Sequence, residues 1–204
     1  MMERSGIEGL IASFQGIPIV KSGEYNYFVH PLSDGIQAIS SSLLTDASKC
    51  LMELLPNLDE FDLMITAEAM GIPLAAALSM ITGKPFSIAR KRSYSLPGEI
   101  TVGQETGYSS SKLHLNLPGA GGRSVIVDDV LSTGGTLKAL AKGIRRSGWS
   151  VDRAFFLFNK MEKVRKNEME KEVGLRITSL LDIEFVGDGF VARRSGNDPG
   201  VSPK

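Results

Sequence analysis

Residues 125–136 read VIVDDVLSTGGT and decide the fold of this chain. Residues 124–127 are wholly apolar after the first, as expected of a strand that is covered on both faces of a sheet. Two carboxylates, Asp128 and Asp129, stand at the end of this strand, and a turn of small and hydroxyl residues then leads into a helix. This succession indicates an open α/β sheet, in which ligands bind at the carboxyl ends of parallel strands.

The turn has the composition of an anion site. Gly134 and Gly135 let the backbone approach a ligand closely. Free amides at a helix N-terminus, together with the hydroxyls of Ser132, Thr133 and Thr136, suit a phosphate monoester. The two carboxylates before the turn could accept hydrogen bonds from sugar hydroxyls or hold a hydrated Mg²⁺. Alternatively, these residues only cap a strand–turn–helix junction. The direct succession of an apolar strand, two aspartates, a hydroxyl–glycine turn and an amphipathic helix argues against this alternative. The turn is neither a Walker A loop nor a Gly-x-Gly-x-x-Gly motif.

A strand, a helix and a second strand follow one another twice along the chain. The first unit comprises residues 61–66, 71–81 and 85–89, and the second comprises residues 124–127, 137–144 and 154–158. The helices are identified by apolar residues at i, i+3, i+4 and i+7 or by an Ala- and Leu-rich run that ends at a glycine. Two such units predict a doubly wound α/β fold with a parallel sheet and helices on its faces.

The rest of the chain is expected to add smaller parts to this domain. Residues 43–54 form an amphipathic helix with N-cap candidates at 40–42, residues 159–173 a charged surface helix, and residues 177–186 a late strand. Residues 91–113 have little helical periodicity, which favours a mobile flap or an extended hairpin. A small hood is expected from the N-terminal segment and the late strand. The single domain is predicted to span residues 1–191, followed by a disordered tail, 192–204, that is rich in Gly and Pro.

Composition excludes several classes of protein. The 204 residues contain 23 basic and 23 acidic side chains, so no net field attracts nucleic acid or an anionic membrane. The one cysteine, Cys50, excludes an internal disulfide and is read as a small buried residue in a reducing compartment. No apolar run reaches transmembrane length and the start has no signal-peptide core, so a cytoplasmic protein is expected. His30 and His114 lack partners at a metal-ligand spacing, and no protein metal site is predicted.

Residues 125–136 resemble the phosphoribosyl pyrophosphate (PRPP) signature of type I phosphoribosyltransferases. The resemblance extends over most of residues 17–158 and is best to the archaeal hypoxanthine/guanine group, a branch related to the adenine enzymes; segments 25–35 and 68–72 are similar to that group. It implies that residues 132–136 hold the 5′-phosphate of PRPP and that Asp128 and Asp129 contact the ribose. It also implies Mg²⁺, bound chiefly through PRPP, and a homodimer.

Two further segments resemble the mobile catalytic loop of the adenine enzymes. Residues 90–99, RKRSYSLPGE, are similar to its start, and residues 104–108, QETGY, to its far side, where that family carries a catalytic glutamate. Glu105 is therefore the expected catalytic residue. Two groups of residues are expected to bind pyrophosphate: Ala69, Met70 and Gly71, and the basic residues Arg90, Lys91 and Arg92. The basic residues could instead form a solvated edge. Glu68 could support the pyrophosphate loop or only stabilise a helix N-terminus.

Three departures from the family patterns bear on the chemistry. Met70 stands where the adenine enzymes have an arginine, so backbone amides of residues 69–71 must supply that contact. Ser132 stands where classical 6-oxopurine enzymes have an aspartate that serves the base N7, which moves proton handling to Glu105. Residues 159–204 match least well.

The predicted reaction joins a purine base to PRPP and releases pyrophosphate. Phe28 and Val29 are expected to contact the base, although a core role for Phe28 is nearly as good an interpretation, and residues 185–188 are a weaker candidate for a wall of the base site. Hypoxanthine and guanine are favoured by the whole-chain resemblance, and adenine is the alternative favoured by the loop chemistry. A PRPP-sensing regulator without catalysis is a second alternative, but the chain begins with no clear helix-turn-helix. A pyrimidine enzyme is disfavoured by the Leu-Pro-Gly-Glu loop.

Overall fold

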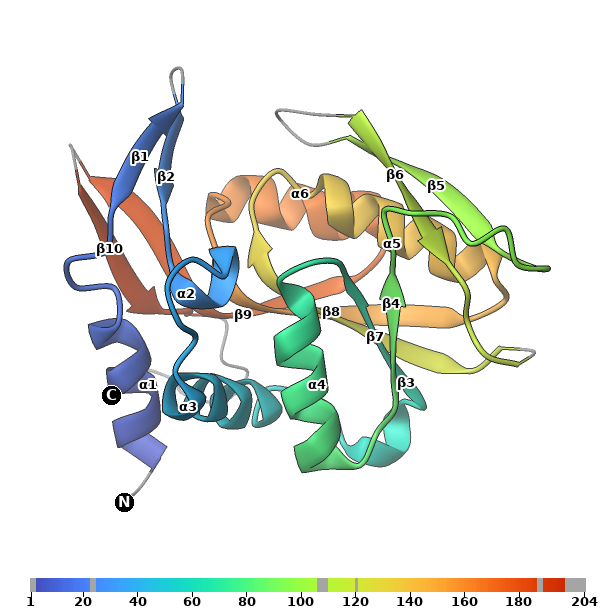
Figure 1. The fold of residues 1–204 in the computed structure, drawn as a ribbon, viewed down its shortest axis with the longest axis horizontal. Coiled ribbons are helices and arrows are strands. Elements are labelled where there is room, and N and C mark those ends of the chain that lie inside the picture. The colour runs from blue at the N-terminus through green and yellow to red at the C-terminus, as the bar shows by residue number, and fades with distance from the viewer. Residues whose placement is uncertain (1–2, 23–24, 106–109, 120, 187–188, 197–204) are drawn as a thin grey trace.

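A six-stranded sheet forms the centre of the computed structural model, which describes residues 3–22, 25–105, 110–119, 121–186 and 189–196 (Figure 1). The strand order is β10-β9-β8-β7-β3-β4, and all neighbouring pairs are parallel except β9 with β10. The strands are β3 (Leu63–Ala67), β4 (Phe86–Ala89), β7 (Arg123–Leu131), β8 (Ser150–Asn159), β9 (Arg176–Val186) and β10 (Gly189–Arg194). The mostly parallel α/β sheet that the sequence predicted is confirmed.

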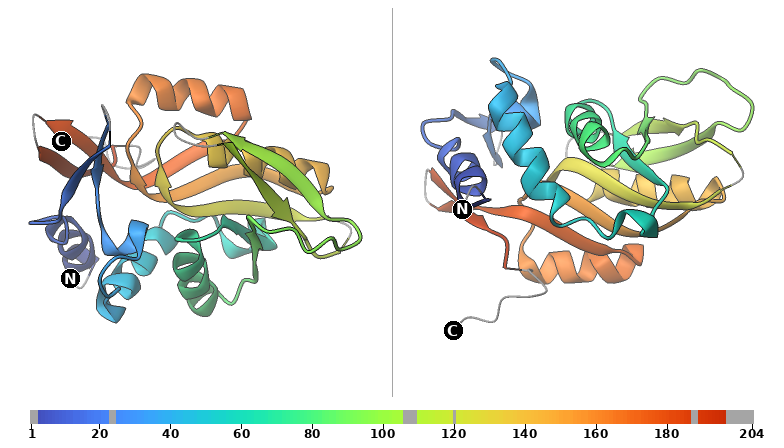
Figure 2. Two further views of the ribbon diagram at one scale, coloured as in Figure 1. Left: turned by 45° about the horizontal axis from the view of Figure 1, so that its top comes forward. Right: turned by 90° about the horizontal axis from the view of Figure 1, so that it is seen from below.

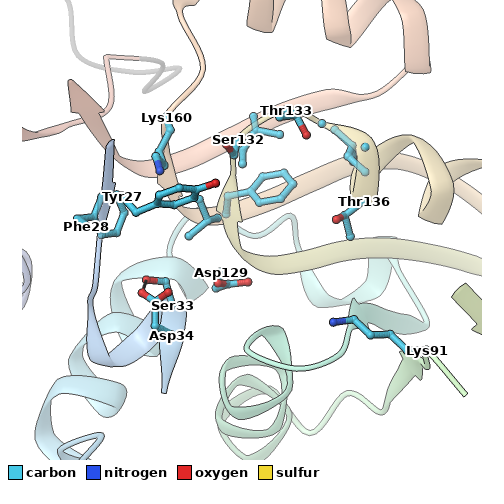
Figure 3. A pocket seen from close by; sticks show the side chains of 16 residues that line it. Tyr27, Phe28, Ser33, Asp34, Lys91, Asp129, Ser132, Thr133, Thr136 and Lys160 are labelled. Atoms are coloured by element: carbon cyan, nitrogen blue, oxygen red, sulfur yellow. Dashed lines mark hydrogen bonds between the residues drawn. The ribbon is translucent and has the colours of Figure 1, made fainter. Parts of the chain in front are cut away.

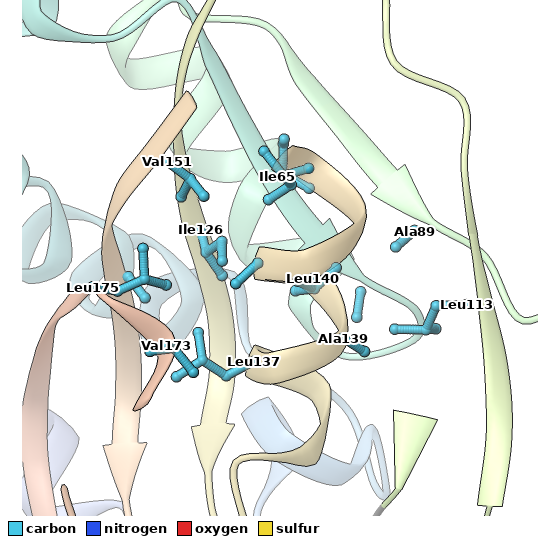
Figure 4. Packing of buried hydrophobic residues seen from close by; sticks show 14 of the residues in the cluster. Ile65, Ala89, Leu113, Ile126, Leu137, Ala139, Leu140, Val151, Val173 and Leu175 are labelled. Carbon is cyan, nitrogen blue, oxygen red and sulfur yellow. The ribbon is translucent and has the colours of Figure 1, made fainter. Parts of the chain in front are cut away.

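Helices cover both faces of this sheet (Figure 2). The helices α3 (Ser41–Met52) and α4 (Gly71–Thr82) lie on one face, and α5 (Gly135–Arg146) and α6 (Lys163–Val173) lie on the other. Successive side chains of a strand point to opposite faces. Thus Val125 and Val127 join the core beneath α3 and α4, whereas Ile126 packs against Leu140 of α5 on the other face (Figure 4). Burial on both faces explains why this strand is apolar throughout.

The direction of winding reverses between β3 and β7, which are neighbours in the sheet. From β3 the chain passes through α4 to β4 at one edge, and from β7 it passes through α5 to β8 in the opposite direction. Open α/β sheets bind ligands at the carboxyl ends of the strands at such a switch point. Residues 68–71 and residues 128–136 both fall there.

Two antiparallel hairpins stand outside the central sheet. The first pairs β1 (Ile19–Ser22) with β2 (Tyr25–Phe28), and the second pairs β5 (Ile100–Glu105) with β6 (Ser110–Leu115). The remaining elements are the helices α1 (Glu3–Ala12) and α2 (Pro31–Asp34) and a 3-10 turn, Leu58–Glu60. The expected hood is present, because Phe28 of the N-terminal segment packs against Phe185 of the late strand β9, and Phe14 and Phe28 also pack against Phe190 of β10.

Some predicted boundaries need correction. Of the two structures expected for the segment 91–113, the extended hairpin is present, but its strands β5 and β6 span Ile100 to Leu115 and the side chains of Val102, Leu113 and Leu115 are buried against the domain. Residues 192–194, assigned to a tail, continue β10, and Ser195 is buried beside Ser179. The helix predicted over residues 159–173 begins only at Lys163. Among the described residues, none of the helices is both long and apolar enough to cross a bilayer.

Candidate functional site

A cavity of about 540 Å³ opens at the carboxyl end of β7 (Figure 3). Side chains of β2, α2, β7 and the loop 132–136 line it, together with Lys91 and Lys160. Seen in Figure 3, Lys160 and Tyr27 lie at one end, Thr136 lies at the other, and Asp129 lies between them. The structure therefore brings four predicted groups together: the hydroxyl–glycine loop, one of the two aspartates, Phe28 and Lys91.

The hydroxyl–glycine loop has the geometry of an anion cradle. Gly134 adopts a left-handed φ of 82° directly before α5, and no side chain caps the helix. The first backbone amides of α5 therefore remain free to donate to a ligand, and Ser132 and Thr133 are exposed beside them. Behind Gly134, the Met169 side chain of α6 occupies the space that a Cβ would need. The left-handed turn favours glycine here, and a larger residue would also have to displace the end of the Met169 side chain.

Asp128 does not line the cavity, although the resemblance implies that it contacts the ribose together with Asp129. The residue is only 6% exposed, and Oδ1 of its carboxyl group lies 3.5 Å from the hydroxyl of Thr66. Gly71, the first residue of α4, approaches so closely that a Cβ there would collide with this hydroxyl and with the Asp128 carboxylate. Burial, followed by the charge of Asp129, raises the pKa of Asp128 well above its ordinary value.

Asp129 faces the cavity. Burial raises the pKa of this carboxyl to about 6, with a smaller contribution from the nearby charge of Asp34, while hydrogen bonds from Asp128 and from the backbone act in the opposite direction. A carboxylate in this state is poorly solvated. Its oxygens can be satisfied by hydroxyl donors or by a cation that enters the cavity.

The residues assigned to pyrophosphate are only partly gathered. Lys91 lines the cavity, whereas Arg90 is engaged elsewhere, its Nε lying 2.6 Å from Oε2 of Glu68. Arg92 lies over the ring of Tyr94, with its guanidinium carbon 5.8 Å from the ring centroid. The side chain of Met70 packs towards Gly35. Ala69 is exposed and Gly71 starts α4, which leaves the backbone of residues 69–71 beside the end of β3.

Glu99, from the Leu-Pro-Gly-Glu motif, anchors the chain between β4 and β5. Its carboxylate accepts hydrogen bonds from the Ser93 hydroxyl, the Tyr94 amide and the Asn116 side chain, and lies 3.2 Å from Nδ1 of His114. These hydrogen bonds lower the pKa of Glu99 to about 2, and the bond from Ser93 has the largest effect. His114 thus has a structural role, as predicted.

The other histidine, His30, is also structural. It is buried, its ring stacks on Phe14, and Nδ1 accepts a hydrogen bond from the Leu32 amide. Burial lowers the pKa of His30 to about 4, so the ring is neutral at physiological pH.

The sequence did not identify Lys160, which lies at the far end of the cavity. Its ammonium lies 5.2 Å from the ring centroid of Tyr27, 4.9 Å from that of Phe28 and 5.3 Å from that of Phe185. Its backbone amide donates to the Leu131 carbonyl at 2.8 Å, which fixes it beside the end of β7. Burial lowers the pKa of Lys160, although the charge of Asp34 partly opposes this. The available signal was its position directly after a strand, at the same edge as Asp129.

Two other predicted site residues are placed less completely. Val29 is half-buried and does not line the cavity, so only Phe28 of the predicted pair does. Glu105 is the last residue of β5 and pairs with Ser110, but its side chain lies outside the described part of the structure, as do residues 106–109 and 187–188. Its catalytic role stays a prediction.

Fold and cavity together define an open α/β protein in which a loop with the geometry of an anion cradle lies at the switch point of its sheet. Residues 46–190 match the phosphoribosyl transferase domain, and the chain belongs to this family. It is 43% identical to the hypoxanthine/guanine phosphoribosyltransferase of Methanohalophilus mahii over 183 residues, which are 90% of this chain and 94% of that protein. The same identity holds over 179 residues, 88% of this chain and 94% of the relative, for the protein of that name from Methanococcus vannielii.

Solved structures give the same assignment of fold. The adenine phosphoribosyltransferase of Thermoanaerobacter pseudethanolicus superposes with a TM-score of 0.67 at 26% identity, covering 86% of this chain and 99% of that one. The Saccharomyces cerevisiae enzyme superposes with a TM-score of 0.68 at 18% identity, covering 86% and 98%. The resemblance to purine phosphoribosyltransferases seen in residues 125–136 is confirmed.

Proposed function

We propose that this chain transfers ribose 5-phosphate from PRPP to hypoxanthine or guanine, giving the nucleoside monophosphate and pyrophosphate, a reaction of purine salvage. One observation carries the proposal: a single cavity has a phosphate cradle at one end, a cation among aromatic rings at the other and a carboxylate between them. This order matches the phosphate, ribose and base of a nucleotide. The names of the archaeal relatives, at 40–43% identity, agree with it.

The base is selected by Lys160. An ammonium can donate hydrogen bonds but cannot accept them. It therefore complements the oxo group at position 6 of hypoxanthine and guanine, and it opposes the amino group of adenine. Tyr27, Phe28 and Phe185 supply aromatic surface for a purine ring around the same ammonium. The adenine alternative loses support because the cavity offers a donor where an acceptor would be needed.

The remaining residues serve the reacting atoms. Positive charge develops on the ribose as pyrophosphate leaves, and Asp129 faces the middle of the cavity, where the sugar would lie. Lys91, Arg92 and the backbone amides of residues 69–71 stabilise the leaving pyrophosphate. Glu105 manages the proton of the purine imidazole. The part of the segment 91–113 outside the buried base of the hairpin excludes water when it closes over the substrates.

Magnesium is proposed as the metal, bound chiefly through PRPP. Asp129 offers the hard oxygen donors that Mg²⁺ prefers. Burial raises the pKa of this carboxyl group, and a bound cation would lower it again by stabilising the carboxylate, so the residues present fit Mg²⁺. When bound, the ion would neutralise charge on the pyrophosphate oxygens. Because most of its ligands would come from PRPP and water, removing Mg²⁺ should abolish turnover without unfolding the protein.

We further propose a cytoplasmic homodimer. The single buried Cys50 suits a reducing compartment. Light scattering after size exclusion, over a range of protein concentrations, would measure the mass of the particle in solution. A monomer at all concentrations would exclude the dimer.

The decisive experiment compares kcat/KM for hypoxanthine, guanine, xanthine and adenine at fixed PRPP and Mg²⁺. Hypoxanthine and guanine should exceed adenine by two orders of magnitude or more, because a mismatched site leaves buried polar groups unpaired. A preference for adenine would overturn the choice of base and leave the PRPP chemistry intact. Absence of turnover with all four bases, together with tight PRPP binding, would favour a PRPP-sensing regulator.

A further inference from the structure

Gln104 connects the β5–β6 hairpin to the phosphate cradle. It is the fifth residue of β5, stands directly opposite Ser111 of β6 and precedes Glu105. Only 8% of the residue is exposed, although its side chain is polar. Its Nε2 donates to the hydroxyl of Thr136 at 2.6 Å, and its Oε1 accepts from the hydroxyl of Ser111 at 2.8 Å. Both ends of this buried amide are therefore satisfied.

The polarity of these hydrogen bonds determines what Thr136 can do. An amide NH₂ can only donate, so the Thr136 oxygen acts as the acceptor in its bond with Gln104. The single hydroxyl proton of Thr136 is then free for another acceptor, and Thr136 lines the cavity at the end where the cradle lies. Ser111 therefore donates a hydrogen bond to Gln104, Gln104 donates one to Thr136, and Thr136 can donate one to a ligand in the cradle.

The hairpin is held firmly enough to keep this contact. A Cβ on Gly143 of α5 would lie in van der Waals contact with Val102 and would press into the side chain of Leu115. Those two residues are 2% and 1% exposed. The base of the hairpin and α5 therefore pack as one unit, and Gln104 meets Thr136 at the first turn of the same helix.

We infer that Gln104 is a positioning residue that holds the Thr136 hydroxyl as a hydrogen-bond donor to the 5′-phosphate of the substrate. The inference rests on the proposed function, because it takes the anion in the cradle to be that phosphate. It also gives strand β5, which ends in Glu105, a direct connection to the cradle.

Two substitutions test the role. Gln104→Glu has nearly the same shape, but its carboxylate accepts the Thr136 proton and so removes it from the ligand. Gln104→Met removes the bond without adding charge. The KM for PRPP should rise roughly 10- to 100-fold in Q104E and about 2- to 10-fold in Q104M, since bonds to charged groups are the stronger ones. The KM for the base should stay within about twofold. Gln15→Glu, on an exposed residue, is the matched control for added charge.

Product binding separates positioning from general damage. GMP carries the phosphate and guanosine does not, so the ratio of their inhibition constants reports the phosphate contribution. This ratio should shrink in Q104E and Q104M, with melting temperatures near that of the wild type. In a Thr136→Ala background, Q104E should cause little further loss, whereas repulsion by the added charge alone would persist.

The binding measurements can separate failure of the positioning role from failure of the proposed function. If the wild-type protein binds neither PRPP nor GMP, the proposed function fails. If the wild type binds both and the two Gln104 variants keep the same ratio of GMP to guanosine affinity, the positioning role is refuted.

Discussion

Replacing Lys160 with methionine tests the choice of base directly. Methionine keeps a long apolar side chain among Tyr27, Phe28 and Phe185 and removes the ammonium. A hydrogen bond to a charged group contributes about 1.5–3 kcal/mol. Since about 1.4 kcal/mol corresponds to a tenfold change, kcat/KM for hypoxanthine and guanine should fall roughly 10- to 150-fold. Activity with adenine should stay the same or rise, because its amino group no longer faces a second donor.

Steady-state kinetics with each base at saturating PRPP, and with PRPP varied at a saturating base, would measure both effects. The KM for PRPP should remain within about twofold, because Lys160 lies at the opposite end of the cavity from Thr136. The fold should persist, since burial already disfavours the charged form of this lysine. Lys163→Met, on an exposed side chain, serves as the control. An unchanged kcat/KM for hypoxanthine and guanine, or an equal loss for adenine, would refute the assignment.

Three other substitutions probe the rest of the site. Asp129→Asn should weaken PRPP binding at least tenfold in calorimetry. It should also stabilise the free protein at pH 7, because the folded-state pKa of about 6 exceeds that of an unfolded aspartate. Stability of the wild type then falls as pH rises from about 4 to 6, so urea unfolding should show no difference between the two proteins below pH ~4. Glu105→Gln should lower kcat on the order of 10²-fold without a change in melting temperature, and wild-type turnover would contradict its role. Gly134→Ala should destabilise the fold by about 1–3 kcal/mol in urea unfolding, because of its positive φ and its contact with Met169, and an unchanged midpoint would show that this contact yields.

The central sheet was predictable because its physical causes are local. Strand β7 is buried on both faces and reads as an apolar run, while α5 shows a clear 3.6-residue period. Gly83 ends α4 in a left-handed conformation, as its position suggested, and Ser40 caps α3 by accepting from the Leu43 amide. Each of these signals depends only on residues within one element.

The peripheral parts were not predictable in the same way. Helix α1 and the β1–β2 hairpin have short, weak patterns, and aromatic contacts with β9 and β10, far along the chain, help to hold them. The segment 91–113 reads as irregular because Gly103 and several polar residues interrupt it, yet Val102 and Leu115 secure it against α5. Non-local packing decided these elements.

Within the candidate site, too, the contiguous motif was predictable from the sequence, whereas the residues that depend on distant contacts were not. The hydroxyl–glycine loop is a contiguous motif, and the sequence identified it. Lys160 contacts Phe28, which lies more than 130 positions away in the sequence. Gln104 bonds to Thr136, which lies 32 positions away. Such pairs follow from the order of strands and the placement of the hairpin, which no periodicity in the sequence specifies.

The acidic pair shows how one motif supports two different tasks. Asp128 turns towards Thr66 and Gly71, where burial keeps its pKa high and its side chain joins the end of β7 to β3 and the start of α4. Asp129 turns into the cavity. Two carboxylates this close do not both ionise readily in a buried setting, so a proton held by Asp128 leaves the charge on Asp129. The signature thus provides one carboxyl group that braces the switch point of the sheet and one that faces the cavity, where we propose that the ribose binds.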